Sequence, residues 1–282
     1  MNTLESTRKN EAGMQRLVDF FHSRTGIKVQ PSKKTFLEGR LQKRLDQYGF
    51  VSMDQYCHWL FEEGGLHQEE ALLIDLATTN KTDFFREIHH FDYLANQVLP
   101  LLQERGAGML APLRIWSAGC SNGAEPYSLA MVCQEFAQAT PGFQFEILAS
   151  DLCTRVLKEA VRAIYPHADV KPVPLPLRQR YLLRDVQQDE VRIIPELRRQ
   201  VRFYHHNLME LPYPPNTAVE VLFCRNLLIY FDKPTQREVL FRLCHYVKPG
   251  GYLFLGHSET VTGLDLPLQP MAPTAFRRLH DG

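Results

Sequence analysis

A loop of small residues could bind a ligand through its backbone. It covers Ser117-Ala118-Gly119-Cys120-Ser121-Asn122-Gly123, at the end of the apolar run 113–119, and leads directly into a helical pattern. Small side chains let a ligand approach the backbone closely, and the start of a helix offers free N–H donors. The pattern is neither GxGxxG nor a loop ending in GK[ST], which argues against a nicotinamide cofactor and a P-loop. Because such turns also occur without ligands, the loop alone identifies no cofactor.

Asp151 is the second feature that suggests chemistry, because it ends the apolar run FEILASD (145–151). An acidic side chain at the end of a strand can accept hydrogen bonds from both hydroxyls of a ribose. The same carboxylate could instead cap the helix that follows. Together with the small-residue loop, Asp151 indicates a cofactor with a nucleoside part, without determining which one.

The histidines and cysteines give no metal pattern. The histidine pairs His89-His90 and His205-His206 and the lone His257 have no carboxylate or cysteine at ligand spacing, so we expect no metal site. No CxxC pair occurs among the six cysteines, which we expect to be reduced and structural, as in a cytoplasmic protein. They are Cys57, Cys120, Cys133, Cys153, Cys224 and Cys244.

The hydrophobic pattern predicts two parts that would hold these residues. Residues 11–95 carry apolar side chains at helical spacing throughout, which predicts a small helical bundle. From about residue 112 short apolar runs alternate with helical patterns, which predicts an open, mostly parallel α/β sheet. The predicted strands cover residues 113–119, 145–151, 201–207, 219–226 and 251–257. Ligands bind such sheets beyond the carboxyl ends of the strands, where the loop and Asp151 lie.

Composition excludes several classes of partner. The 282 residues contain 32 Lys+Arg and 32 Asp+Glu, so the whole molecule has no net field that would attract nucleic acid or an anionic membrane. The polar N-terminus lacks the apolar core of a signal peptide, and no stretch approaches the ~20 apolar residues of a spanning helix. We therefore expect a cytoplasmic protein that neither inserts into a membrane nor binds nucleic acid.

Three segments resemble the CheR family of chemoreceptor methyltransferases: TTNKTDFFREIHHF (78–91), WSAGCSNGAEPYSLAM (116–131) and FCRNLLIYFDKPTQ (223–236). The shorter ASDL (149–152) and GHSE (256–259) support the resemblance, which extends from about residue 15 to 279. It implies an α/β fold, namely a class I (Rossmann-like) methyltransferase domain with a small inserted β-subdomain, preceded by an all-α N-terminal domain.

We expect the helical domain at residues 1–96 and a linker at 97–112, where Pro100, Gly106, Gly108 and Pro112 occur. The methyltransferase domain would cover 113–282, with the β-subdomain at about 181–200.

The resemblance implies that the chain transfers the methyl group of S-adenosylmethionine to glutamate side chains of chemoreceptor cytoplasmic helices. The products would be glutamate methyl esters and S-adenosylhomocysteine, and we expect the enzyme to be a monomer. Two alternatives stay open: a methyltransferase of another substrate, and a non-catalytic S-adenosylmethionine-binding signalling module.

The resemblance also implies functional residues. Arg86 and Tyr230 would shape the methyl-transfer site. Asn122 and Ala124 stand where the family usually has Thr and Glu, but we expect cofactor binding to survive because Glu125 remains. The residues implied to bind the cofactor are Asn80, Thr82, Arg86, Gly119, Glu125, Asp151, Asn207, Leu208, Arg225 and Asn226.

Two further expectations concern the receptor. The basic residues Lys33, Arg40, Lys43 and Arg44 in the predicted helix 31–46 would dock acidic receptor helices, although they could equally form a solvated face. A nucleic-acid interface is disfavoured because no Asn/Asp-Pro-Pro-Tyr motif is present.

Some family members bind a receptor C-terminal pentapeptide through a glycine-rich loop. The corresponding segment 181–200 contains no glycine, carries Asp185, Asp189 and Glu190, and has Pro195 where a pairing edge should end. We therefore predict a pentapeptide-independent enzyme.

Overall fold

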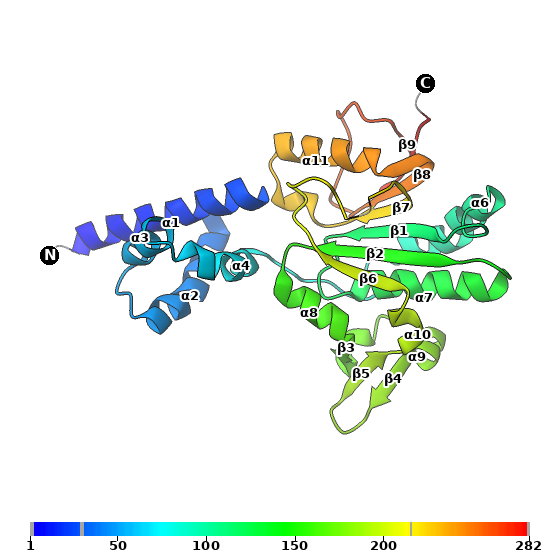
Figure 1. Ribbon diagram of the computed structural model, residues 1–282, viewed down its shortest axis with the longest axis horizontal. Helices are drawn as coiled ribbons and strands as arrows, with labels where there is room; N and C mark the ends of the chain where they lie inside the picture. Colours follow the sequence, from blue (N-terminus) through cyan, green and yellow to red (C-terminus); the bar gives the residue numbers. More distant parts are fainter. Residues whose placement is uncertain (1–2, 29–30, 215, 281–282) are drawn as a thin grey trace. The chain divides into compact units, whose positions relative to one another are not determined.

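The computed structural model describes residues 3–28, 31–214 and 216–280, with the side chains of 3–10 and 31–36 outside this description. The chain forms two compact units (Figure 1). One is a helical unit of Met1–Thr79 with Tyr230–Thr235, and the other is an α/β unit of Asn80–Ile229 with Gln236–Gly282.

The helical unit is a bundle around one apolar core. Its helices are α1 (Thr3–Thr25), α2 (Pro31–Tyr48), α3 (Met53–Glu62) and α4 (Leu66–Ala77). The predicted stripe of Leu37, Leu41 and Leu45 is buried, as expected for one apolar face of a helix. Residues 230–235 join this unit through an antiparallel bridge between Ile27 and Phe231.

The α/β unit is built on a seven-stranded sheet in the order β6-β2-β1-β7-β8-β10-β9. The five strands from β6 to β8 are parallel, and β10 and β9 continue the sheet antiparallel. The expected α/β fold and its five predicted strands are confirmed. The strands are β1 (Leu113–Ala118), β2 (Phe145–Asp151), β6 (Val201–His205), β7 (Val219–Cys224), β8 (Val247–Leu255), β9 (Leu268–Ala272) and β10 (Ala275–Arg278).

Side chains alternate between the two faces of the sheet. One face contributes Ile115, Ile147 and Phe223 to a core shared with α7 (Ala124–Ala139). The opposite face carries Trp116, whose ring packs on Tyr213 and on Tyr246. Helix α11 (Lys233–His245) ends just before Tyr246.

The predicted boundary between the domains is wrong. The two units divide between Thr79 and Asn80, and the expected linker 97–112 contains helix rather than an exposed connection. Leu99 and Leu102 are buried in the same core as Phe254, which ties this segment to the sheet. Pro100 misled the prediction because proline is tolerated in the first turn of a helix. The segment comprises α5 (His89–Tyr93), the π-helical η1 (Leu94–Val98) and α6 (Leu99–Glu104).

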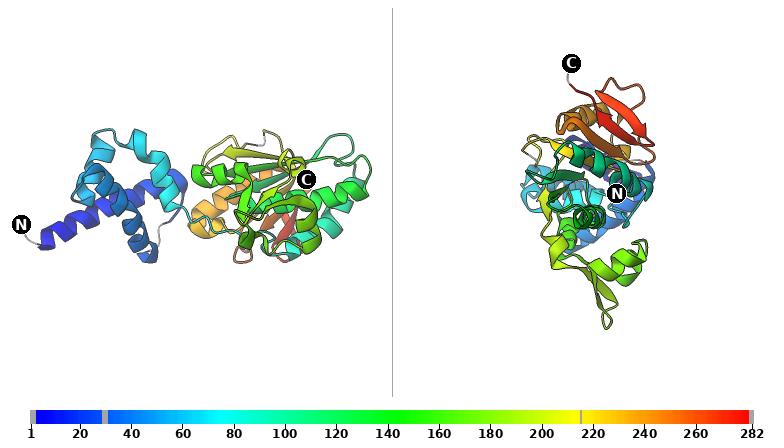
Figure 2. Two further views of the ribbon diagram at one scale, coloured as in Figure 1. Left: turned by 90° about the horizontal axis from the view of Figure 1, so that it is seen from below. Right: turned by 90° about the vertical axis from the view of Figure 1, so that its right-hand side faces the viewer.

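The β-subdomain is larger than predicted and projects from the α/β unit (Figure 2). Its antiparallel sheet has the order β3-β5-β4, and Pro195 begins α10 rather than ending a paired edge. Helix α8 (Thr154–Arg162) packs against β2 and β6 of the main sheet and leads into the subdomain. The subdomain elements are β3 (Ile164–Pro166), η2 (His167–Val170), α9 (Leu175–Tyr181), β4 (Leu182–Asp185), β5 (Glu190–Ile193) and α10 (Pro195–Arg198). Among the described residues, no helix is long and apolar enough to cross a membrane.

Candidate active site

The candidate site lies at the carboxyl ends of the central strands. Chain order reverses beside β1, because β2 and β6 follow on one side of it and β7 and β8 on the other. Such a switch point separates the loops that leave neighbouring strands and forms the usual ligand crevice of an open α/β sheet. The loop after β1, Asp151 at the end of β2, and Arg225 after β7 are all in this region.

Asp151 holds the small-residue loop. Its Oδ2 accepts a hydrogen bond from the Ser121 amide at 2.8 Å, and its Oδ1 accepts one from the Cys153 amide at 2.9 Å. Cys153 precedes the first turn of α8, so the capping role and a ligand role are compatible. A carboxylate oxygen has two lone pairs and can accept more than one hydrogen bond, so these backbone contacts do not by themselves exclude a ribose hydroxyl. The left-handed backbone of Gly119 and Gly123 lets the loop turn back at this point (φ 78° and 91°).

The segment that begins at Asn80 lies beside this loop. The Ser121 hydroxyl donates to the Asn80 carbonyl at 2.8 Å, and the Asn80 amide donates to Cys153 Sγ at 3.3 Å. Thr82 is half-buried in the same segment. The structure therefore brings the predicted Asn80 and Asp151 together, as a shared pocket requires.

Asn207 and Leu208 follow β6, whose last residues pair with the end of β2. The His206 amide donates to the Asp151 carbonyl at 2.9 Å, which fixes this stretch beside the predicted ribose site. Both Asn207 and Leu208 are buried. Their position beside Asp151 is compatible with the expectation that they flank the adenine.

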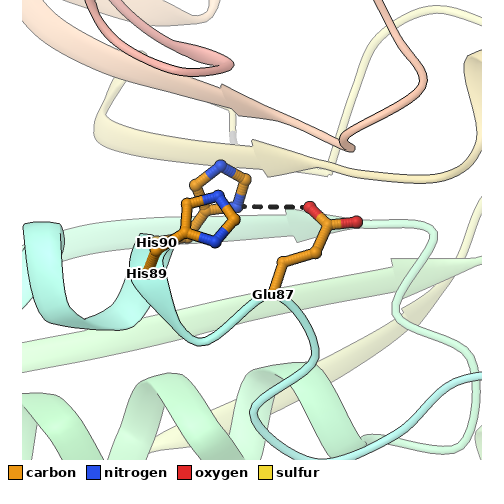
Figure 3. A group of neighbouring side chains, drawn as sticks. All are labelled: Glu87, His89 and His90. Carbon is orange, nitrogen blue, oxygen red and sulfur yellow. Dashed lines mark ion pairs between the residues drawn. The ribbon is translucent and has the colours of Figure 1, made fainter.

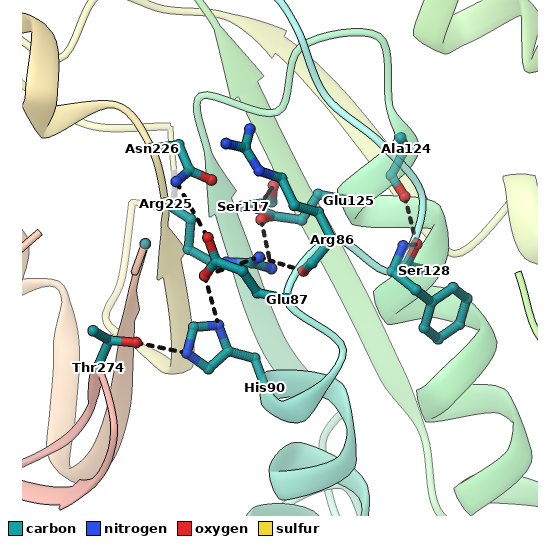
Figure 4. Close-up of polar contacts among 12 residues, drawn as sticks. Arg86, Glu87, His90, Ser117, Ala124, Glu125, Ser128, Arg225, Asn226 and Thr274 are labelled. Atoms are coloured by element: carbon teal, nitrogen blue, oxygen red, sulfur yellow. Dashed lines mark hydrogen bonds and ion pairs between the residues drawn. The ribbon is translucent and has the colours of Figure 1, made fainter. Parts of the chain in front are cut away.

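Arg225 is the centre of a buried charge cluster (Figure 4). Its side chain is 2% exposed, and its guanidinium lies 3.3 Å from Glu125 Oε2 and 3.4 Å from Glu87 Oε2. Burial raises the pKa of Glu125, and Arg225 and the Ser117 hydroxyl offset only part of this rise. Burial also acts on Glu87, but Arg225 and hydrogen bonds from His257 and Asn226 hold the pKa of Glu87 below its ordinary value. Arg225 therefore forms ion pairs with two carboxylates at once.

Arg86 has a different environment. Its guanidinium is half-buried and makes one hydrogen bond within the described residues, from Nη1 to the Lys81 carbonyl at 3.3 Å. Because no ion pair joins Arg86 to a carboxylate in the part of the chain that the structure describes, Arg86 can bind an anionic group. Tyr230, the other residue predicted to be catalytic, belongs to the helical unit, where its carbonyl accepts from the Lys28 amide at 2.8 Å. Its role stays a prediction.

The donor set fits S-adenosylmethionine. Glu87 and Glu125 outnumber the guanidinium of Arg225, and this excess of negative charge suits a ligand with sulfonium and ammonium groups. Arg225 Nε and Nη1 and Glu87 Oε2 are buried without a hydrogen-bond partner among the described residues. Such atoms can still bond a ligand. Asp151 would hold the ribose, and Arg86 could hold the methionine carboxylate.

Glu87, His89 and His90 form the one group of potential metal ligands found among the described residues (Figure 3). Our reason for expecting no metal, the absence of a carboxylate near the histidines, is wrong here, because Glu87 Oε2 lies 3.6 Å from His90 Nδ1. The guanidinium of Arg225, 3.4 Å from the same oxygen, already supplies the positive charge and opposes a second cation.

Sequence reasoning missed three residues of the site. Glu87 and Ser128 fall inside the segments that resemble the family, yet their residue types suggested no role. Glu259, the last residue of GHSE, is buried and accepts hydrogen bonds from the backbone amides of Gly256 and of residues 226–228. In the sequence, the only sign of this role for Glu259 was an acidic residue close to an apolar strand.

The predicted docking residues do not form one exposed face. Arg40 donates to the Leu76 carbonyl at 2.6 Å, near the end of α4, and Arg44 pairs with the buried Glu69. The prediction that these two arginines are exposed docking charges is therefore corrected. Lys43 is exposed, and the Lys33 side chain lies outside the described residues.

Comparison with known proteins gives a consistent result over most of the chain. The family "CheR methyltransferase, SAM binding domain" matches residues 80–276, and "CheR methyltransferase, all-alpha domain" matches residues 12–78. A chemotaxis protein methyltransferase of Borreliella burgdorferi is 36% identical over 267 residues, covering 94% of this chain and 93% of that protein.

Two further relatives carry similar names. Chemotaxis protein methyltransferase 2 of Pseudomonas aeruginosa is 39% identical over 237 residues, covering 83% of this chain and 81% of the relative. The chemotaxis protein methyltransferase of Escherichia coli is 36% identical, covering 91% of this chain and 87% of that protein.

Proposed function

The chain belongs to the family of CheR methyltransferases, and on this basis we propose that it methylates glutamate side chains of chemoreceptor cytoplasmic helices. Membership makes it an S-adenosylmethionine-dependent methyltransferase of chemotaxis. The ester product, the glutamate acceptor and the receptor helices are the proposed part, together with S-adenosylhomocysteine as the second product.

The observation that carries this proposal is the contrast between two arginines. Arg225 is paired with Glu87 and Glu125, whereas the guanidinium of Arg86 makes a single hydrogen bond, to a carbonyl, within the described parts of the chain. An anionic acceptor or the cofactor carboxylate needs a cation that is still available, and Arg86 meets that need. Where Arg86 binds the acceptor rather than the cofactor carboxylate, an acidic acceptor is favoured over a neutral or cationic one.

The chemistry makes modest demands on the protein. A glutamate side chain has an ordinary pKa of about 4.3 and is already ionised at neutral pH, so no strong general base is required. When bound, S-adenosylmethionine supplies an electrophilic methyl group next to a positive sulfur. The residues of this chain have to orient the acceptor carboxylate and exclude water, because neutralisation of charge is favoured in a dry site. Arg86 is proposed to steer this carboxylate.

We also propose that the helical unit docks the receptor helices. With Arg40 and Arg44 engaged internally, exposed Lys43 is the remaining described member of the predicted basic set. A pentapeptide tether is not part of this proposal.

The test is transfer of a tritiated methyl group from S-adenosylmethionine to a receptor cytoplasmic fragment. The proposal predicts label that alkali releases as methanol and that is absent when the acceptor glutamates are replaced by alanine. Alkali-stable label, or label on DNA in a parallel reaction, would favour a methyltransferase of another substrate. Cofactor binding without label on any acceptor would favour the signalling-module alternative.

A further inference from the structure

Arg86 lies between two residues with unusual backbone conformation. Phe85 and Glu87 both adopt left-handed φ angles, 51° and 56°, although neither is glycine. A side chain with a Cβ atom is disfavoured in this region, and such residues persist only where their surroundings hold them. The turn that presents Arg86 is therefore maintained by contacts outside the turn itself.

Two of these contacts bond the backbone on either side of the Arg86 side chain (Figure 4). The Phe85 amide donates to Ser128 Oγ at 3.0 Å, and that hydroxyl donates in turn to the Ala124 carbonyl at 2.7 Å. The carbonyl of Arg86 accepts a hydrogen bond from Arg225 Nη2. Ser128 is completely buried, so the first contact is shielded from water.

Glu87 provides the third set of contacts. Its Oε1 accepts from the Asn226 side-chain amide and from the His257 backbone amide, both at 3.3 Å, while Oε2 lies 3.4 Å from Arg225. Glu87 thereby fixes the same guanidinium that bonds the Arg86 carbonyl. Figure 4 draws no contact between the Glu87 carboxylate and the Arg86 guanidinium, so Glu87 can act on the Arg86 turn without itself pairing with that guanidinium.

We propose that Glu87 is a positioning residue for Arg86, holding the left-handed turn through Arg225 and Asn226 so that the Arg86 guanidinium faces its anionic ligand. This inference rests on the proposed methyl-transfer function. The two arginines then have different roles, because Arg225 is the buried support and Arg86 is the group that contacts the ligand. A structural ion pair would contribute to stability alone, whereas a positioning residue changes turnover.

The test is Glu87→Gln, which keeps the size and one acceptor oxygen and removes the charge facing Arg225. We expect the kcat for receptor methylation to fall by about 10- to 100-fold, the scale for a misplaced catalytic group. Because Glu87 also belongs to the donor set for S-adenosylmethionine, kcat is compared at saturating cofactor, where the fall should persist. The matched control is Glu146→Gln, which removes a carboxylate paired with Arg114 at 2.7 Å away from the site and should leave kcat unchanged.

Ser128→Ala is the second variant, and it tests the same inference if Glu87→Gln does not fold. It removes the acceptor for the Phe85 amide and should also lower kcat with cofactor affinity retained. A wild-type kcat in a folded Glu87→Gln enzyme overturns the inference. So does a loss of activity that disappears at saturating cofactor, because Glu87 would then act in cofactor binding. Failure of the wild-type enzyme to methylate any receptor would refute the proposed function instead, which keeps the two failures distinguishable.

Discussion

Arg44 and Glu69 form a two-point ion pair within the helical unit, with Arg44 Nε 2.9 Å from Glu69 Oε2 and Nη2 bonded to Oε1. Glu69 is 2% exposed and also accepts hydrogen bonds from the hydroxyls of Tyr48 and Tyr56, each at 3.0 Å. A buried carboxylate needs such partners because burial without them is costly. Arg44 therefore stabilises the bundle, where the sequence had suggested a docking charge.

Arg44→Ala is expected to destabilise the helical unit by about 3–5 kcal/mol, because it leaves the Glu69 carboxylate buried and unpaired. Chemical unfolding followed by circular dichroism measures the change. Lys43→Ala, at the exposed neighbouring position, serves as the control and should be nearly neutral. Wild-type stability in Arg44→Ala would show that the ion pair contributes nothing.

Arg86→Ala and Arg225→Ala should fail in different ways. Arg86→Ala is expected to abolish measurable methyl transfer while changing unfolding free energy by less than ~1 kcal/mol, since it removes a half-buried cation and little packing. Arg225→Ala leaves Glu87 and Glu125 without their common partner and should cost about 3–5 kcal/mol of stability. Tritium transfer and thermal unfolding on both variants give the comparison. Full turnover in Arg86→Ala would remove it from the methyl-transfer site.

Asp151→Ala should weaken S-adenosylmethionine binding by about 1–3 kcal/mol, the scale for hydrogen bonds to a charged group. Asp185→Ala is the matched control, because Asp185 also accepts two backbone amides, from Gln187 at 2.9 Å and Gln188 at 3.2 Å, but in the subdomain hairpin. Calorimetric titration with the cofactor measures both. An unchanged dissociation constant in Asp151→Ala would show that Asp151 only holds backbone amides of the loop and of the start of α8 and does not bind the cofactor.

His90 should make the α/β unit less stable in weak acid. Burial, reinforced by the charge of Arg225, lowers the pKa of His90 to about 4 in the folded protein. Unfolded histidine titrates near pH ~6.5, so between these values the unfolded state binds a proton that the folded state does not. This contribution to stability is therefore intact above pH ~6.5 and declines as the pH falls toward ~4, by up to ~3 kcal/mol.

His90→Gln removes that titration and should flatten the dependence of the unfolding midpoint on pH between about 7.5 and 5.5. His89→Gln is the control at an exposed position and should retain the wild-type slope. Equal slopes in all three proteins would contradict the assignment to His90.

The strands and the cofactor loop could be predicted because their signals are local. Each parallel strand is a short apolar run between turn residues, and Asp151 directly follows such a run. The partner of Arg44 could not be predicted, since Glu69 lies 25 residues further along the chain. On a helical wheel a basic residue looks the same whether it faces water or a buried carboxylate.

The domain boundary and the role of Glu87 were hidden for related reasons. The segment around Pro100, Gly106 and Gly108 has the composition of a linker, but Leu99 and Leu102 are buried in the core of the α/β unit. Local composition carries no information about that tertiary packing. The left-handed turn at Glu87 lacks glycine, so the residue type gave no sign of the conformation.

We expect the β-subdomain not to tether a receptor C-terminal peptide. Within the described residues β4 pairs only with β5, so its other edge is open and Pro195 does not block strand addition, contrary to our sequence argument. The hairpin between β4 and β5 contains no glycine. Asp189 is its residue with a left-handed backbone conformation, at φ 50°. Arg184, 4.0 Å from Asp189, is already paired with an acidic neighbour. The prediction of pentapeptide independence therefore depends on the charge and shape of the hairpin, and no longer on the lack of a strand edge for the peptide to pair with.

We expect a peptide with the acidic C-terminus of a tethering receptor to give no binding heat up to about 1 mM, equivalent to a binding free energy weaker than about −4 kcal/mol. A receptor fragment lacking its last five residues should be methylated with the same kcat/KM as the intact fragment. The double variant Asp185→Asn, Glu190→Gln removes like-charge repulsion at the hairpin and should gain weak affinity if charge is the obstacle. Micromolar binding of the peptide to the unaltered protein would contradict the prediction, because strand addition at the open edge of β4 would then suffice without a glycine-rich loop.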